Sequence, residues 1–550
     1  MSPETFDYVI VGAGSAGAVV ASRLSEQSAV HVLLLEAGPV NRALEISMPA
    51  GFTNLFRTTW DWDYHTTAQP GLGGRSAYWP RMKALGGCSS MNAMMYIRGA
   101  AADFDGWERH FGAAGWGYRD VLPYFIRAEA NSGLGGPLHG TAGPLHVEDR
   151  RYTHRLSTAW IDAAQQSGLT PNPDFNGVTQ SGVGPYQVTC RRGRRWSTAE
   201  AYLGAEVLAR PNLTVHTAAH ACRIVVDNGR ATGVWYLRDG HLQLATATSE
   251  IVLSGGAINS PQLLMLSGIG PAEHLRDVGI DVVVDLPGVG ANLHDHPVTP
   301  LLWRTRGTTD IAVDHVRPPN LLRWQFLGRG PLVSNIGEAG GFVTTRSGLQ
   351  GPDIQFIVAP TGLYDNGLQE PAGRMFTTGV TLVDVASRGT LRLAGADPRW
   401  RPRLDPAYFA EHIDVQTMLA GCRQAIDIVR TGPLARLIDR PFLHGSDDLD
   451  TAALTRVLRR WTQTLYHPVG TCAMGSGDKA VVDADLRVRG VDGLRVADAS
   501  VMPRVTRGNT NAPTVMIGEK AADLLRGTHP PVDSRAATAK KAATTMQAVL

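Results

Sequence analysis

A glycine-rich turn near the N-terminus constrains the fold of this 550-residue chain more than any other sequence feature. The turn, Gly12-x-Gly14-x-x-Gly17, follows the β-branched apolar run 7–11 and precedes a segment with helical apolar spacing at 18–24. The first glycine permits a tight bend, the second lets a pyrophosphate approach the backbone, and the third lets helix and strand pack closely. The pattern predicts a βαβ dinucleotide-binding unit whose helix N-terminus faces the phosphates.

An acidic residue ends the second strand of this predicted unit. Glu36 closes the buried apolar run 30–36, and it lies 19 residues after Gly17. A carboxylate at this place can accept hydrogen bonds from ribose hydroxyls, and it would repel the additional phosphate of NADP. The fingerprint therefore predicts either NAD or FAD, and it does not distinguish between them.

The composition is that of an ordinary globular protein. Hydrophobic residues make up 43% and charged residues 19% of the chain, and the net charge is +2, so we expect no nucleic-acid partner. The five cysteines are scattered without a CxxC pair, which predicts neither a metal site nor a disulfide framework and favours a reducing, cytoplasmic location. No apolar run is long enough to cross a bilayer, so we expect no integral membrane segment.

Beyond the N-terminal unit, strand patterns alternate with long irregular stretches. Residues 38–84 are irregular and rich in aromatics, which in a compact protein is typical of a functional segment. Residues 213–253 alternate apolar and polar positions and predict strands of a small sheet. A strand at 494–497 and a helix at 513–525 end the folded part, and the Ala-, Thr-, Lys- and Pro-rich residues 528–550 predict a flexible tail.

One histidine lies in a loop that suits proton transfer. His467 belongs to the sequence YHPVG at 466–470, where the following proline favours an extended backbone. Histidine is the natural general base near neutral pH, although for any one of 17 histidines a structural role is the commoner outcome. Asn511, at the start of the predicted last helix, is either a helix cap or a hydrogen-bond donor to a substrate oxygen opposite His467.

Four sequence blocks, taken in order, resemble the signatures of the glucose–methanol–choline (GMC) oxidoreductases. The resemblance covers nearly the whole chain, up to about residue 526, and four correctly spaced motifs are highly specific. The blocks are VGAGSAG at 11–17 with EAG at 36–38, KALGGCSSMN at 83–92, GGAINSPQ at 255–262 with SGIG at 267–270, and HP at 467–468 with DAS at 498–500 and NAP at 511–513.

The resemblance implies an oxidoreductase that binds FAD non-covalently. Some members attach FAD to a histidine in the second block, where this chain has Met91. The resemblance implies that His467 and Asn511 are the catalytic pair, and an asparagine in place of a second histidine is similar to the choline and simple-alcohol branch. The residues that it implies for cofactor binding are Gly12, Gly14, Ser15, Gly17, Glu36, Ala37, Gly86, Gly87, Asn92, Met95, Ala221, Asp498 and Ala499.

The fold that the resemblance implies is mixed α/β, with a Rossmann-like FAD-binding domain built from several segments and a sheet-based substrate-binding domain. The histidines of NLHDH at 292–296 are interpreted as structural. We expect the FAD-binding segments at 1–155, 206–300 and 461–527, the last with the catalytic residues, and the substrate-domain segments at 156–205 and 301–460.

The predicted reaction is the oxidation of a primary alcohol, aliphatic or aromatic, to its aldehyde. His467 would accept the hydroxyl proton, Asn511 would hold the oxygen, and flavin N5 would take the hydride. Choline is the alternative substrate, but it calls for an acidic and aromatic cage that we cannot locate in residues 300–460. The acceptor is oxygen, a quinone or another electron carrier, and the dehydrogenase branch is favoured. An NAD-dependent dehydrogenase and a non-redox or light-driven flavin enzyme are the rival hypotheses.

Overall fold

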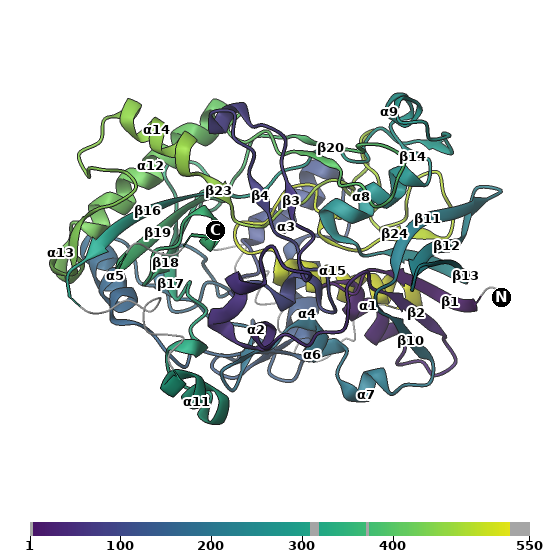
Figure 1. Ribbon diagram of the computed structural model, residues 1–550, viewed down its shortest axis with the longest axis horizontal. Coiled ribbons are helices and arrows are strands. Elements are labelled where there is room, and N and C mark those ends of the chain that lie inside the picture. The colour runs from purple at the N-terminus through teal and green to yellow at the C-terminus, as the bar shows by residue number, and fades with distance from the viewer. Residues whose placement is uncertain (1–3, 308–317, 370–372, 529–550) are drawn as a thin grey trace.

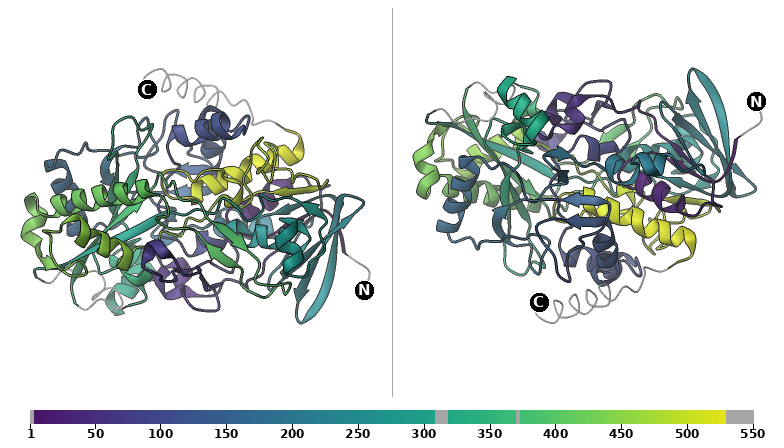
Figure 2. Two further views of the ribbon diagram at one scale, coloured as in Figure 1. Left: turned by 90° about the horizontal axis from the view of Figure 1, so that it is seen from above. Right: turned by 90° about the horizontal axis from the view of Figure 1, so that it is seen from below.

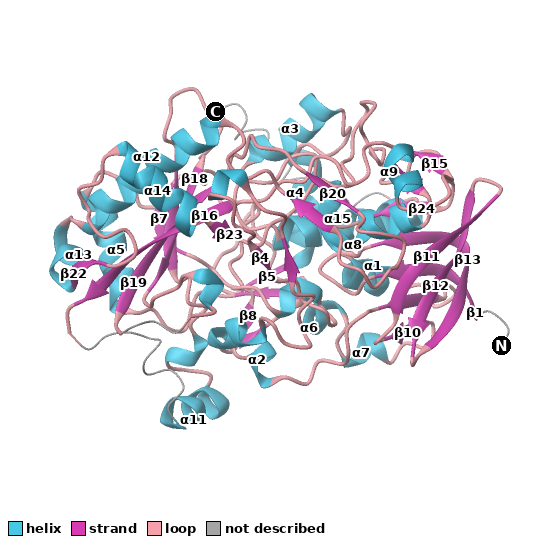
Figure 3. Ribbon diagram, turned by 45° about the horizontal axis from the view of Figure 1, so that its top comes forward, coloured by secondary structure: helices cyan, strands magenta, loops and turns pink. Residues whose placement is uncertain are grey.

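The computed structural model describes residues 4–307, 318–369 and 373–528. Two seven-stranded sheets organise the molecule, one towards each end of its long axis (Figure 1). Much of the chain between the two sheets is loop (Figure 3). The fold is mixed α/β, as predicted, whereas nearly all of the predicted tail, residues 529–550, lies outside the described residues.

The N-terminal strand lies in the middle of the first sheet, where it pairs in parallel with a strand on either side. Five strands of this sheet run parallel, and two antiparallel strands extend it. In spatial order the strands are β10 (Leu213–His216), β2 (Val32–Leu35), β1 (Glu4–Val11), β13 (His241–Leu253), β12 (Arg230–Arg238) and β11 (His220–Asp227), with β24 (Leu494–Val496) pairing with β13.

Helices from both ends of the chain cover the parallel part of this sheet. α1 (Gly17–Leu24) follows β1 directly, and α15 (Asn511–Arg526) packs against α1 and α4 (Tyr118–Ala128), as Figure 2 shows. β2 is fully buried, which explains its unbroken apolar sequence, since parallel strands are covered on both faces.

The turn between β1 and α1 explains two of its glycines. Gly12 has a φ of +100°, a conformation that side chains rarely adopt. A Cβ on Gly17 would lie 1.9 Å from the carbonyl oxygen of Gly12. The first glycine therefore allows the bend, and the third allows α1 to pack closely on the end of β1.

The second sheet is antiparallel throughout. α5 (Arg155–Gln166) and α12 (His412–Val429) contact this sheet and each other, so they cover the same face and leave the opposite face to the middle of the molecule. In spatial order its strands are β22 (Ile438–Pro441), β16 (Pro297–Thr305), β19 (Met375–Leu382), β18 (Ile354–Ala359), β17 (Ala339–Val343) and β7 (Gly182–Pro185), with β23 (Gln463–Thr464) pairing with β16.

The remaining elements are mostly short, and the predicted irregular segment 38–84 contains only brief helices and one two-residue strand pair. The other α-helices are α2 (Leu44–Ser47), α3 (Ala101–Phe111), α6 (Thr198–Tyr202), α7 (Ala205–Leu208), α8 (Gly256–Leu266), α9 (Ala272–Asp277), α11 (Pro318–Leu327), α13 (Gly432–Leu437) and α14 (Thr451–Trp461). The 3₁₀ helices are η1 (Pro49–Leu55), η2 (Pro70–Leu72), η3 (Gly87–Ser90), η4 (Pro331–Val333), η5 (Asp365–Gly367) and η6 (Ala499–Val501). The small strand pairs are β3 (Tyr64–His65) with β4 (Tyr78–Trp79), β5 (Glu129–Asn131) with β6 (Leu145–Val147), β8 (Cys190–Arg191) with β9 (Arg194–Arg195), β14 (Ile269–Gly270) with β15 (Val284–Asp285), and β20 (Thr390–Arg392) with β21 (Arg403–Asp405).

Three global features bear on function. Within the described ranges, no helix combines the length and the apolar character that crossing a bilayer requires. The same ranges contain no group of three or more His, Cys, Asp or Glu side chains suited to a metal ion. All five cysteines are free thiols.

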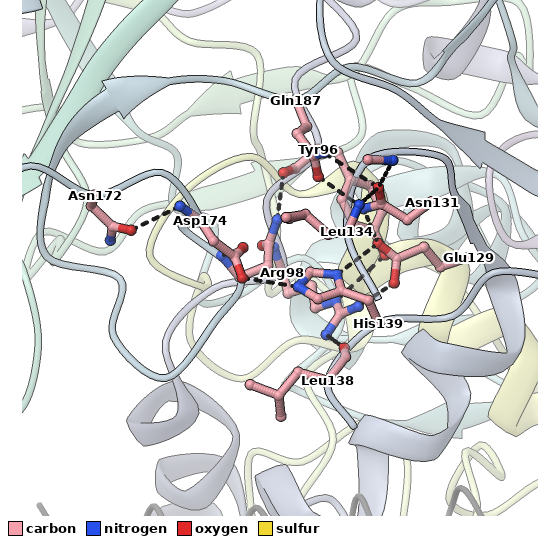
Figure 4. Close-up of polar contacts among 12 residues, drawn as sticks. Tyr96, Arg98, Glu129, Asn131, Leu134, Leu138, His139, Asn172, Asp174 and Gln187 are labelled. Atoms are coloured by element: carbon pink, nitrogen blue, oxygen red, sulfur yellow. Dashed lines mark hydrogen bonds and ion pairs between the residues drawn. The ribbon is translucent and has the colours of Figure 1, made fainter. Parts of the chain in front are cut away.

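A charged cluster of largely buried side chains is shown in Figure 4. The guanidinium of Arg98 pairs with Glu129, and both side chains are almost completely buried. His139 bridges two carboxylates, with Nδ1 3.1 Å from Glu129 Oε1 and Nε2 2.9 Å from Asp174 Oδ2. Burial by itself lowers the pKa of His139, but the hydrogen bonds to Asp174 and Glu129 outweigh it and raise the pKa above its ordinary value. The cluster therefore favours a charged histidine.

Candidate active site

A cavity of about 310 Å³ lies between the two sheets. Glycine-rich turns and strand ends of the first sheet form one end of it. Alternate side chains on the open face of the second sheet, together with the loop that carries His467, form the other. The segments predicted to bind a cofactor and the predicted catalytic histidine therefore meet at one cavity.

Eleven of the thirteen residues that the sequence suggests for cofactor binding line this cavity. Gly17 and Gly86 do not line it, because Gly17 packs on the Gly12 carbonyl and Gly86 (φ +83°) lies against the hydroxyl of Ser90. The structure thus places Gly86 in the turn next to the cavity wall, and its contact with the flavin stays a prediction. The lining residues are Gly12, Gly14, Ser15, Glu36, Ala37, Gly87, Asn92, Met95, Ala221, Asp498 and Ala499.

Two glycine-rich turns meet in the cavity wall. A Cβ on Gly87 would lie 2.7 Å from the Cα of Gly14, so the two backbones touch without side chains between them. Ser15 follows in the same turn, at the N-terminus of α1, where backbone N–H groups favour a negatively charged group. This bare backbone surface leaves room for a pyrophosphate.

Glu36 ends β2 in the cavity wall. Its carboxylate accepts hydrogen bonds from the backbone N–H groups of Ala13 (3.0 Å) and Gly38 (2.7 Å). Burial raises the pKa of Glu36 to about 7, despite these two bonds. Each carboxylate oxygen has a second lone pair, so the side chain can also accept hydrogen bonds from ribose hydroxyls.

Asp498 and Asn92 hold the segments around them. Asp498 accepts hydrogen bonds from the backbone of Gly256 (2.8 Å), the hydroxyl of Ser260 (2.6 Å) and the backbone of Ser500 (2.8 Å). Asn92 Oδ1 accepts from the guanidinium of Arg195 at 2.9 Å. Both residues therefore fix backbone that lines the cavity, in addition to lining it themselves.

His467 is 8% exposed and its imidazole makes two contacts that define its protonation. Nε2 lies 3.4 Å from the amide nitrogen of Asn509, and Nδ1 lies 3.0 Å from Nδ1 of His296. An amide nitrogen can only donate, so Nε2 must carry a lone pair. The ring proton is then on Nδ1 and is donated to His296. The nitrogen beside Asn509 is therefore free to accept a proton.

The surroundings of His467 keep its ring neutral. Burial lowers its pKa well below the ordinary value, and the nearby His296 and Arg81 lower it further. Burial likewise lowers the pKa of His296 to about 3, against the opposing effects of the Val383 backbone and Asp384. Neutral imidazole is the form that can act as a proton acceptor.

A buried carboxylate positions the backbone of this histidine rather than its ring. Asp295 accepts hydrogen bonds from the backbone N–H of His467 (2.7 Å), the hydroxyl of Thr464 (2.6 Å) and the hydroxyl of Tyr408. The neighbouring His294 bonds to the backbone of Asn292 and Val505. These contacts hold the loop after β23 against the start of β16.

Asn511 does not contact His467. It is the first residue of α15, and its side-chain oxygen accepts a hydrogen bond from Ser15 Oγ at 2.8 Å. Asn509, two residues earlier, places its amide at His467, and its own oxygen accepts from Gln355 at 3.3 Å. The structure therefore pairs His467 with Asn509, and it places the predicted partner Asn511 at the glycine turn. The side chain of Asn511, at the first position of α15, thus contacts the turn before α1.

Two models described as GMC oxidoreductase match residues 6–298 and 385–518, which together exceed half of the chain. The chain belongs to the GMC oxidoreductase family. Enzymes of this family act on CH–OH groups, and this chain is accordingly an oxidoreductase that binds FAD.

Relatives of this GMC oxidoreductase include proteins of several named activities. It is 48% identical to an uncharacterized GMC-type oxidoreductase of Mycobacterium tuberculosis (94% of this chain, 99% of the relative). It is 41% identical to an alcohol dehydrogenase [acceptor] of Pseudomonas putida (94% and 95%) and to mitochondrial choline dehydrogenase of Mus musculus (97% and 91%). A solved formate oxidase of Aspergillus oryzae RIB40, studied for its FAD modification, is 27% identical with a TM-score of 0.89 (95% and 98%).

The cavity of this GMC oxidoreductase fits FAD. The side-chain-free contact of Gly14 with Gly87 offers space for the diphosphate, and Glu36 offers a carboxylate for the ribose. Met91, which lines the same cavity, is a thioether without the nitrogen that a histidyl attachment requires.

Two residues that contact His467 in this GMC oxidoreductase were not predicted from the sequence. His296 was interpreted as structural together with its neighbours, and Asn509 was passed over for Asn511. The signal for Asn509 was present in the GNTN sequence at 508–511, but only the starting point of α15 distinguishes the two asparagines. No local signal marks His296, because its contact spans 171 residues of sequence.

Proposed function

We propose that this GMC oxidoreductase oxidises a neutral primary alcohol, aliphatic or aromatic, to its aldehyde, with His467 as the proton acceptor. The observation that carries the proposal is the position of His467 Nε2 in the wall of the cavity, 3.4 Å from the amide nitrogen of Asn509, which favours a lone pair on Nε2. A buried neutral imidazole facing a cavity is suited to take the hydroxyl proton as the alcohol is oxidised.

Three side chains have distinct roles in the proposed oxidation. His467 Nε2 accepts the hydroxyl proton, and Asn509, whose amide has two N–H donors, holds the alcohol oxygen. His296 acts as a positioning residue, because its Nδ1 accepts from His467 Nδ1 and thereby keeps the lone pair on the opposite nitrogen. FAD, when bound, supplies the acceptor for the hydride that leaves the alcohol carbon.

Asn509 thus takes the role that the sequence suggested for Asn511. Asn511 and Ser15, hydrogen-bonded to each other at the glycine turn, instead suit the binding of the cofactor. Both asparagines line the cavity, but only Asn509 lies within hydrogen-bond reach of His467.

The substrate end of the cavity combines apolar and neutral polar residues with one cation. The carboxylates among its described lining residues are Glu36 and Asp498, which are both bound to backbone at the cofactor end, whereas Arg81 contributes a cation near His467. A quaternary ammonium would find no carboxylate on the cavity wall beside the base, because Asp295, which bonds to the backbone of His467, does not line the cavity. The residues of the second sheet that line the cavity are Val298, Pro300, Ile357, Ala359, Thr377, Gly379, Gln463 and Thr464.

Choline is the second candidate, because the chain is 41% identical to a mitochondrial choline dehydrogenase over most of both lengths. The aromatic pair Phe56 and Tyr466, with ring centroids 5.9 Å apart, also faces the cavity and could contact a cation. We place choline second because aromatic rings act on ammonium groups most strongly in concert with a carboxylate.

We also propose that the electron acceptor is a quinone or another electron carrier. The similarity to an alcohol dehydrogenase named for a separate acceptor favours a quinone or another electron carrier over oxygen. The free thiols fit a reducing compartment, which supports a location in the cytoplasm.

The test is to mix the FAD-loaded enzyme anaerobically with a panel of primary alcohols and to follow the flavin absorbance at about 450 nm. Choline and 3,3-dimethylbutan-1-ol form the matched pair, since they differ only in the charge of the quaternary centre. We expect the neutral isostere to bleach the flavin faster than choline, and we expect the bleaching to be lost in His467→Ala.

Two results would contradict the proposal. Faster bleaching by choline than by its neutral isostere would establish the second candidate. A bound flavin that stays oxidised with every alcohol would reject alcohol oxidation and favour a non-redox or light-driven reaction. Admission of oxygen or a quinone to the reduced enzyme then separates oxidase from dehydrogenase.

A further inference from the structure

One helix of the second half of the molecule carries an apolar face that the described residues leave exposed. α11 stands away from the body of the protein in Figures 1 and 3. Eleven large hydrophobic side chains are exposed among the described residues, and four of them lie on this ten-residue helix. These four are Leu321, Leu322, Phe326 and Leu327.

The helix is anchored in an orientation that turns this face outward. Trp324 is fully buried, and its indole N–H donates to the backbone of Gly193 at 3.0 Å. Leu322 and Phe326 are four residues apart and lie on the side of the helix opposite Trp324. They are 58% and 76% exposed. A water-facing helix surface normally carries polar residues at such positions, so the apolar pair calls for an explanation.

Exposed arginines lie on α11 and in the segment that contacts it. Arg323 and Arg329 are exposed on α11 and just after it, and Arg191 and Arg192 are exposed in the β8–β9 turn. This turn adjoins α11 through the Gly193 bond and through the guanidinium of Arg194, which lies 4.6 Å from the Trp324 ring centre. Residues 190–196 and 318–330 contain no aspartate or glutamate.

We propose that α11 and the β8–β9 turn form a surface that docks on an anionic lipid bilayer. Leu322 and Phe326 would enter the boundary between headgroups and acyl chains, and the four exposed arginines would contact lipid phosphates. A protruding helix with an apolar tip and exposed arginines nearby is typical of proteins that lie on a membrane surface without crossing it.

The charges argue against a second copy of this chain as the occupant. A symmetric dimer built on this surface would bring the same arginines of both copies together. Like charges in such an interface repel, and residues 190–196 and 318–330 contribute no carboxylate to compensate them, while the neighbouring Glu148 is buried against the backbone of Arg192 and Gly193. An anionic bilayer provides the complementary charge over the whole surface.

The docking surface adjoins the active-site cavity. Trp324 packs against Met48 and Ala50 at the start of η1. The same 3₁₀ helix carries Phe52, which lines the cavity. The proposed membrane contact is therefore connected to the cavity wall through Trp324 and η1, so that an apolar alcohol or acceptor dissolved in the bilayer would be held close to the enzyme.

The test measures binding of the full-length, FAD-loaded protein to sedimented vesicles, without any substrate. The vesicles are phosphatidylcholine alone or phosphatidylcholine with about one third phosphatidylglycerol. We expect binding to the anionic vesicles that weakens with rising salt. The double variant Leu322→Gln/Phe326→Gln should lower the partition coefficient by about tenfold or more, because two apolar side chains no longer enter the bilayer.

The matched control is Leu242→Gln, which removes a 59% exposed leucine from β13 of the first sheet. It should bind like the wild type, and unchanged flavin absorbance should verify that all variants are folded. Failure of the wild type to bind anionic vesicles would overturn the proposal, as would equal binding by the double variant. A dimer seen by light scattering that dissociates in the double variant would also overturn it, in favour of a second copy.

Discussion

Two buried histidines of this protein have opposite electrostatic surroundings. His139 bridges Glu129 and Asp174 in the charged cluster, whereas the ring of His467 contacts His296 and Asn509. Burial lowers the pKa of both side chains, but only His139 has carboxylates on its ring that reverse the effect. The comparison teaches that the hydrogen-bond partners of the ring decide which buried histidine is charged.

A carboxylate is nonetheless present beside His467, and its target explains the difference. Asp295 bonds to the backbone N–H of His467 and not to its imidazole. It therefore fixes where the ring lies without stabilising a charge on the ring. The catalytic histidine gains a fixed position and keeps the neutral form that accepting a proton requires.

The largest expected difference between the two histidines is in turnover. His467→Ala should lower kcat/KM for the best alcohol by about two to four orders of magnitude, because the proton acceptor is removed. His139→Ala should change it by less than about threefold, since that ring does not line the cavity. Anaerobic flavin reduction measures both variants, and comparable losses in the two would break the comparison.

The charged cluster should in turn matter more for stability. Glu129→Gln leaves the buried guanidinium of Arg98 without its partner, so it should lower the free energy of unfolding by about 3–5 kcal/mol. Glu26→Gln, which removes a carboxylate that pairs with Arg23 and Arg526 near the surface, should cost about 1 kcal/mol or less. Urea unfolding distinguishes the two variants. A loss of about 1 kcal/mol or less in Glu129→Gln would show that the cluster contributes no more than a surface pair.

Substitution of the two asparagines tests which of them acts together with His467. Asn509→Ala should slow flavin reduction by about a hundredfold, because it removes the amide that faces Nε2 of His467. Asn511→Ala should slow it by less than about threefold but weaken retention of FAD, since it loses the bond to Ser15. The rate of reduction and the flavin content after gel filtration separate the two effects. A larger loss of rate in Asn511→Ala than in Asn509→Ala would support the sequence-based prediction that Asn511 is the catalytic partner of His467.

The smallest expected effect is an opposite pH dependence of stability. The raised pKa of His139 stabilises the fold below about pH 6.5 and this contribution is lost as pH rises through the folded pKa. His139→Gln should therefore destabilise more at about pH 5.5 than at about pH 9. The lowered pKa of His467 costs the wild type stability as pH falls below about 6.5, so His467→Gln should gain relative stability there. Unfolding curves at both pH values test the signs, and the same sign in both variants would refute the comparison.

Local sequence patterns predicted the elements that depend on neighbouring residues. The strand at 7–11, the glycine turn and the helix at 18–24 were found because their periodicity and turn chemistry are contained in one short segment. The helix at 513–525 was also placed correctly, within α15. These elements bring the cofactor end of the cavity together.

The parts that escaped prediction depend on pairings between distant segments. His296 reaches His467 because the start of β16 pairs with β23, and nothing near either histidine encodes that pairing. The bridge from His139 to Glu129 and Asp174 likewise joins three separate segments. Asn509 and Asn511 differ only by their place relative to a helix start, which sequence reasoning fixes less sharply than the existence of the helix.

The open face of the second sheet has a consequence for how such an enzyme can diversify. Along β16, β18 and β19, alternate side chains point into the cavity, and their neighbours point to the opposite face. Ile354 and Val380, for example, lie against Gly421 of α12. What the enzyme accepts and what keeps the sheet packed are thus encoded by interleaved but separate positions. Selection can therefore change the cavity-facing residues to fit a new alcohol, while the residues that pack the sheet and those that transfer the proton stay unchanged.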